Sequence, residues 1–111
     1  MLTNSELKDL RKYLSRLKGS SMTKPFTKTL LVFSVGETAF AYLETGKQIQ
    51  RLSLRSDPVL SEFLKERYEE VLPGQKLDQR KWITVILSGQ LSFEEITALI
   101  DQSYQLAQSE A

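Results

Sequence analysis

Apolar residues recur at the three- and four-residue spacing of an amphipathic helix in three segments of the chain, 7–17, 59–71 and 96–107. One face of each predicted helix is therefore apolar, and we expect it to be buried. On the first and third helices the expected core residues are Leu10, Leu14, Ile96 and Ile100. On the second helix the expected buried stripe comprises Val59, Leu60, Phe63, Leu64, Tyr68 and Val71, with Phe63 and Leu64 in the core.

Polar residues that cap helix N-termini stand immediately before each of these segments. A serine or threonine followed three residues later by glutamate has the spacing of a capping box, in which each side chain accepts a hydrogen bond from the other residue's backbone N–H. An aspartate followed by proline also marks a helix start. The capping residues are Thr3 with Glu6, Asp57 before Pro58, and Ser92 with Glu95. The sequence therefore predicts where all three helices begin.

Four runs rich in apolar residues predict strands, at 29–35, 38–43, 48–54 and 82–87. The connections between the first three runs are short, which favours hairpins and an antiparallel meander. Residues 19–28 contain turn-forming Gly and Pro and are predicted to form a loop. The order α-β-β-β-α-β-α predicts an α+β fold, an antiparallel sheet with three helices in a single domain over residues 1–111. The expected core residues of the strands are Phe33, Phe40, Leu52 and Val85.

The amino-acid composition excludes several kinds of catalytic site. None of the 111 residues is cysteine or histidine, so disulfides, zinc–thiolate sites and nucleophiles activated by histidine are excluded. The sequence also lacks the glycine patterns of nucleotide-binding loops. We therefore expect no cofactor and no bound metal, and we interpret the protein as a non-enzymatic one.

Hydropathy gives no indication of a membrane segment. The longest unbroken apolar run, Leu30 to Phe33, is far too short to span a bilayer. The first residues lack the basic and then apolar pattern of a secretion signal. We therefore expect a cytoplasmic protein with no membrane partner.

Positive charge is concentrated at the start of the chain, although the net charge is only +1. Residues 1–28 hold seven Lys or Arg and two Asp or Glu, whereas residues 92–111 hold four acidic residues and no basic one. Lys8, Lys12 and Arg16 recur every four residues and so share one face of the first helix. Such a ridge fits a phosphate backbone, or it is the solvated outer face that amphipathic helices usually have.

Short motifs follow one another in a recognisable order along the chain. They are Leu54-Arg55 before Pro58, the Pro73-Gly74 turn, the segment Leu77-Asp78-Gln79-Arg80-Lys81-Trp82, the strand Val85-Ile86-Leu87 and the helical Asp101-Gln102-Ser103-Tyr104. Upstream, Pro25-Phe26 and the run from Leu31 to Gly36 extend the set. Together these motifs resemble the MmcQ/YjbR family, small bacterial proteins in a superfamily with frataxin-like folds, over roughly residues 25–107.

The resemblance implies the fold of that family and the DNA-binding role with which the family is labelled. Arg55 stands where the family has lysine, and Lys81 stands where it has a histidine before the tryptophan, so a role that depends on this histidine is lost here. The superfamily also suggests iron binding, which needs clustered carboxylates. Because the first helix is basic, we interpret the acidic residues of the second helix as solvated and predict no metal site.

The best candidate site is a basic segment that contains an aromatic residue. Cations neutralise phosphates, and an aromatic ring can stack on a base. The candidate nucleic-acid-binding residues are Arg51, Arg55, Lys76, Arg80, Lys81 and Trp82. A single tryptophan more often packs in a core, so we expect Trp82 to be buried. We predict a module that binds nucleic acid weakly and in a salt-dependent manner; the alternative is a protein–protein interaction module without nucleic-acid affinity.

Overall fold

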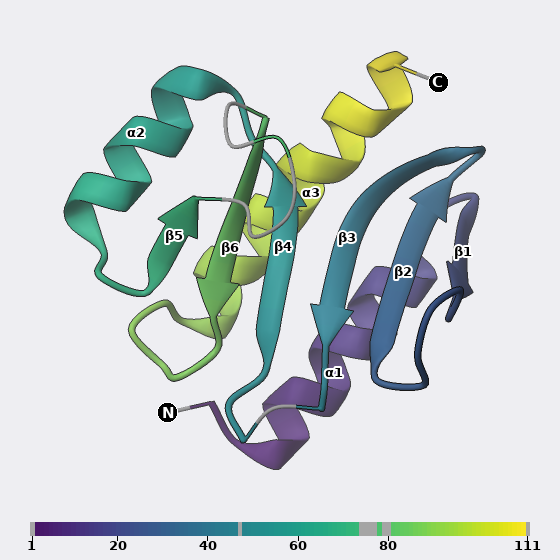
Figure 1. The fold of residues 1–111 in the computed structure, drawn as a ribbon, viewed down its shortest axis with the longest axis horizontal. Coiled ribbons are helices and arrows are strands. Elements are labelled where there is room, and N and C mark those ends of the chain that lie inside the picture. The colour runs from purple at the N-terminus through teal and green to yellow at the C-terminus, as the bar shows by residue number, and fades with distance from the viewer. Residues whose placement is uncertain (1, 47, 74–77, 79–80, 111) are drawn as a thin grey trace.

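The computed structural model describes residues 2–46, 48–73, 78 and 81–110, which form three helices and six strands (Figure 1). The helices are α1 (Asn4–Arg16), α2 (Pro58–Arg67) and α3 (Phe93–Glu110). The strands are β1 (Ser20–Thr23), β2 (Leu30–Val35), β3 (Thr38–Glu44), β4 (Arg51–Arg55), β5 (Val71–Pro73) and β6 (Trp82–Ile86). They form one antiparallel sheet in the order β1-β2-β3-β4-β6-β5. The predicted α+β class is therefore confirmed.

The core lies between the sheet and two of the helices. Figure 1 shows α1 and α3 behind the sheet, whereas α2 lies at its side, next to the edge strand β5. Every second residue of a strand faces the helices, and these side chains interdigitate with the apolar stripes of α1 and α3. Nine of the ten predicted core residues are buried: Leu10, Leu14, Phe33, Phe40, Leu52, Leu64, Val85, Ile96 and Ile100.

The predicted helix starts are confirmed by their hydrogen bonds. The Thr3 hydroxyl accepts from the Glu6 N–H at 3.0 Å, and the Glu6 carboxylate accepts from the Thr3 N–H at 3.1 Å. Ser92 and Glu95 form the same reciprocal pair. The backbone N–H of Ser92 stabilises the carboxylate of Glu95, and this lowers the pKa of Glu95.

Two strands, β1 and β5, were not among those predicted. β1 lies within residues 19–28, which were predicted to form a loop, and the order is therefore α-β-β-β-β-α-β-β-α. β1 has four mostly exposed residues and β5 has three, and both lie at edges of the sheet. An edge strand pairs on one side only and needs little apolar surface, so its sequence gives almost no alternation to detect.

The predicted buried stripe of α2 is wrong in part. Leu64 is buried, but Phe63 is 55% exposed and Val59 is 81% exposed. At about 100° per residue, Val59 and Phe63 lie roughly 140° and 100° around the helix from Leu64. α2 lies beside the sheet (Figure 1), and its buried residues are Ser61 and Leu64, so only a narrow face of it packs against the rest of the protein. The apolar face of this helix is therefore wider than the surface available to bury it.

Candidate functional site

Arg55, a predicted nucleic-acid-binding residue, lies at the end of β4 and is held from three sides. Its Nε donates to the carbonyl oxygen of Ala39 at 2.7 Å, and its Nη1 lies 2.6 Å from a carboxylate oxygen of Glu110 on α3. Its guanidinium carbon lies 4.8 Å from the centre of the Trp82 ring. Only 14% of its side chain is exposed. Two of its five N–H donors are therefore engaged within the protein, and Glu110 occupies the position that a phosphate would need on Nη1.

Ser103 on α3 joins the ends of β3 and β4 next to Arg55. The pairing of β3 with β4 stops at Ala41 and Leu54, so the strands separate beyond this point. Ser103, fully buried on α3, fills the opening: its hydroxyl donates to the carbonyl of Phe40 at 2.5 Å and accepts from the Arg55 N–H at 2.8 Å. A single hydroxyl thus replaces hydrogen bonds that the two strands no longer make with each other.

Trp82 is buried, as predicted, with 6% of its surface exposed. Its ring makes an edge contact with Tyr42 at 5.3 Å between centroids, and Arg55 lies over it. Arg55 and Trp82 are direct cross-strand partners in β4 and β6, which brings them together. A ring enclosed in this way is not open to stack on a base, so its contact with Arg55 is a packing contact.

The structure separates the remaining members of the predicted basic segment. Arg51 is half-buried at the opposite end of β4 from Arg55, about 13 Å away at the usual rise of a strand. Lys81 is exposed just before β6. Lys76 and Arg80 lie outside the described residues. Arg51 therefore does not join Arg55 and Lys81 in one patch.

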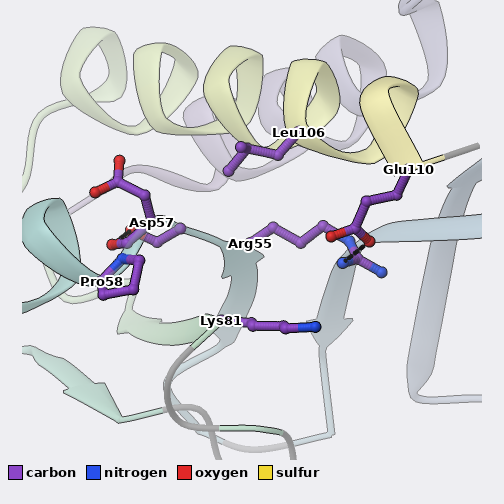
Figure 2. Close-up of a pocket in the computed structure, with 7 residues that line it drawn as sticks. Arg55, Asp57, Pro58, Lys81, Leu106 and Glu110 are labelled. Atoms are coloured by element: carbon purple, nitrogen blue, oxygen red, sulfur yellow. Dashed lines mark hydrogen bonds and ion pairs between the residues drawn. The ribbon is translucent and has the colours of Figure 1, made fainter.

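Lys81 and Arg55 line a hollow of about 480 Å³ between the start of α2 and the end of α3 (Figure 2). The lining residues are Arg55, Ser56, Asp57, Pro58, Lys81, Leu106 and Glu110. Asp57 caps α2, since its Oδ1 accepts from the N–H of Leu60 at 2.9 Å. The hollow therefore has two cations, two carboxylates and an apolar wall. Sequence reasoning did not find it, because its residues come from three distant parts of the chain.

α1 carries a row of cations on its exposed side, as predicted. Lys8, Lys12 and Arg16 are exposed, and none of them forms an ion pair with another described residue. The opposite side of the helix is buried through Leu10 and Leu14. These cations are therefore available to bind a polyanion. The same arrangement is also that of an ordinary solvated helix face.

α1 is fastened to α3 by a polar contact, in which the hydroxyl of Tyr13 donates to a carboxylate oxygen of Asp101 at 2.5 Å. The hydrogen bond to Asp101, with burial and the nearby negative charge, raises the pKa of Tyr13 from 10.0 to about 12. The bond needs the protonated phenol and therefore stabilises the folded state fully below pH 10.

We expect the wild-type protein to lose more stability between pH 10 and pH 12 than the Tyr13→Phe variant. The sign follows from the raised pKa, because the unfolded chain releases the phenol proton near pH 10 and the folded chain does so only near pH 12. Chemical denaturation at a series of pH values measures this difference. Equal slopes in the two proteins would show that Tyr13 is not protected by Asp101.

The described residues contain no group of three His, Cys, Asp or Glu that could hold a metal ion. On α2, the carboxylate of Glu62 lies 2.8 Å from the ammonium of Lys65. Among the described residues, none of the three helices combines the length and the hydrophobicity that a membrane span requires.

The fold and these surfaces define a small α+β protein built on a six-stranded antiparallel sheet. The YjbR family model matches residues 15–106, and the chain belongs to this family. It is 34% identical over 73 residues to the uncharacterised protein YjbR of Escherichia coli K12, covering 66% of this chain and 62% of the relative. It is 34% identical over 64 residues to the uncharacterised protein YyaQ of Bacillus subtilis, covering 58% and 53%. The matched part thus spans less than two thirds of these relatives.

Two solved structures resemble the fold. A crystal structure of the Deinococcus radiodurans protein DR2400, with a family-model domain called DUF419, superposes with a TM-score of 0.88 at 32% identity and covers 94% of this chain and 79% of the other. A crystal structure of a Pseudomonas syringae protein superposes with a TM-score of 0.77 at 23% identity and covers 96% and 99%. Because the Pseudomonas syringae protein is only 23% identical to this chain, its structure supports a shared fold and nothing more. The family predicted from the sequence is therefore confirmed.

Proposed function

We propose that the protein is a non-enzymatic binding module and that it binds another protein with the outer face of α2. The observation that carries this proposal is the exposure of Val59 and Phe63. The two side chains are four residues apart and therefore adjacent on the helix surface. Large apolar side chains that are exposed next to each other are typical of interaction sites, and aromatic residues often provide most of the binding energy.

The charges around this apolar pair indicate the chemistry of the partner. Glu62, Glu66 and Glu69 are exposed on α2 or just after it, and of these Glu62 is paired with Lys65. Arg67 lies over the Phe63 ring, with its guanidinium carbon 5.9 Å from the ring centre, so among the described residues Glu66 and Glu69 supply the unpaired charge at the rim. The complementary surface is an apolar protein surface with cations at its rim, since opposite potentials favour docking.

The non-enzymatic part of the proposal rests on how the polar groups are used. The hydroxyl of Ser103 bonds to backbone groups of β3 and β4, and Tyr13 bonds to Asp101. Each of these groups therefore has a structural role. A nucleophile needs an adjacent base that is free to take its proton, and the sequence has no histidine to do so.

Photo-cross-linking from position 63 tests the proposal. A benzophenone analogue of phenylalanine at Phe63 should form an adduct with one protein in the cells that produce this chain. The purified partner should then bind the Val59→Ser, Phe63→Ser double variant at least about 30-fold more weakly than the wild type, the loss expected for a central interface anchor.

Phe26 provides the matched control, because it is also exposed, at 76%, but lies far from α2 in the chain, between β1 and β2. Phe26→Ser should bind the partner like the wild type. Equal weakening by both variants, or no effect of the α2 variant, would contradict the proposal.

Nucleic acid remains a second candidate, favoured by the exposed cations of α1. Fluorescence polarisation with an arbitrary DNA duplex at two salt concentrations tests it, because each phosphate contact contributes about −0.9 to the slope of log affinity against log salt. Lys8→Gln with Lys12→Gln should flatten this slope if α1 is the interface. Arg80→Ala with Lys81→Ala should flatten it if the predicted basic segment is the interface. Absence of binding at low salt would exclude this candidate.

A further inference from the structure

We propose that the hollow between α2 and α3 binds a small monocarboxylate, with Arg55 as the anion-binding group and Glu110 as an internal carboxylate that occupies this group in the absence of ligand. Figure 2 shows Glu110 reaching from the end of α3 to the guanidinium of Arg55, and the side chain of Lys81 extending alongside that of Arg55. This inference is independent of the protein partner proposed for α2.

Arg55 is held in place before any ligand arrives. The Ala39 carbonyl fixes its Nε and the Trp82 ring supports its guanidinium plane, so binding an anion costs little further ordering of this side chain. Within the described part of the chain, its Nη2 has no hydrogen-bond partner. Once Glu110 leaves Nη1, both terminal nitrogens of Arg55 can donate. The planar guanidinium then matches the two oxygens of a ligand carboxylate.

Glu110 is the partner that can leave. The side chain of Glu110 is 50% exposed, compared with 14% for Arg55. Glu110 is also the last residue of α3. The unpaired carbonyls at a helix C-terminus repel a carboxylate, so the position is unfavourable for Glu110 apart from its contact with Arg55. A dissolved carboxylate can therefore replace it at modest cost.

The charges around the hollow select a ligand with one negative charge. When Glu110 is displaced, the charged groups that remain in the lining are the cations Arg55 and Lys81 and the carboxylate of Asp57. Asp57 stays in place, because it caps α2 through Leu60. One net positive charge remains, which a monocarboxylate neutralises. Inorganic phosphate carries more than one negative charge on average at neutral pH and would leave excess negative charge in a hollow that also holds Asp57.

The wall of the hollow indicates the rest of the ligand. Leu106 and Pro58 supply apolar surface beside the cations. A volume of about 480 Å³ lies in the range of small-molecule sites. A short aliphatic chain on the carboxylate would cover this surface and gain binding energy from its burial, which acetate cannot do. Hexanoate is therefore a suitable probe.

The fluorescence of Trp82 reports on binding directly, because it is the only tryptophan in the chain and its ring contacts Arg55. At constant ionic strength, hexanoate should change this fluorescence with a saturable curve in the millimolar range. Acetate and inorganic phosphate should each need higher concentrations. A non-saturable response to hexanoate, or a response no stronger than that to acetate or phosphate, would overturn the proposal.

Two substitutions that leave Arg55 and the core in place complete the test. Glu110→Gln removes the internal competitor and should tighten hexanoate binding about two- to fivefold, the range that a half-exposed ion pair supports. Lys81→Gln should weaken it about two- to fivefold for the same reason. Glu66→Gln, an exposed carboxylate on the outer face of α2, should bind like the wild type. An unchanged affinity in Glu110→Gln, or the same gain in Glu66→Gln, would show that Glu110 does not occupy a ligand site.

Discussion

The Ile100→Ala variant should lower the free energy of unfolding by about 2–5 kcal/mol, the usual cost of removing a large aliphatic side chain from a packed core. Ile100 is fully buried on α3, in the cluster that joins this helix to the sheet and α1. The substitution removes apolar contacts and leaves a cavity that neighbouring side chains cannot fill completely. Urea denaturation followed by the fluorescence of Trp82 measures the change.

Phe63→Ala is the natural comparison, because both residues belong to predicted buried faces and only Ile100 is buried. With more than half of its side chain exposed, Phe63 should contribute about 0.5 kcal/mol or less to stability, as surface positions usually do. A loss for Phe63→Ala as large as that for Ile100→Ala would show that the outer face of α2 is packed. It would also remove the basis for proposing a protein partner there.

The Ser103→Ala variant should lower the free energy of unfolding by about 2–4 kcal/mol. It leaves two backbone groups without partners, one buried at a cost of about 1–3 kcal/mol and one partly buried at a lower cost. The carbonyl of Phe40 and the N–H of Arg55 both lose the hydroxyl that joins them. Removing the bond to Arg55 should also disturb the contact between Arg55 and Trp82, and so shift the emission of Trp82.

Ser109→Ala is the matched control on the same helix. Its hydroxyl bonds to the carbonyl of Gln105 on an exposed surface, where water can replace it. This variant should unfold like the wild type, with the same emission. Ser103→Ala with the stability of the wild type would mean that the opening between β3 and β4 closes or admits water without cost.

Local sequence patterns determined much of this fold. The capping residues fixed the starts of α1, α2 and α3, because capping depends on atoms within four residues of one another. The alternation and length of apolar runs determined β2, β3, β4 and β6, and the short turns determined the antiparallel meander of β2, β3 and β4. The order of motifs was sufficient to identify the family. Each of these features depends on neighbours in the sequence.

Only the tertiary structure decided how the surfaces are used. α2 is apolar on a broad arc, and its place beside the sheet determines that Leu64 is buried while Phe63 is exposed. Arg55 reads as a free cation in the sequence, but separation of β3 from β4 directs it to Ala39 and Glu110. The hollow likewise exists only where α2, α3 and the strand ends meet. These outcomes depend on contacts between residues far apart in the chain, which periodicity and local propensity do not encode.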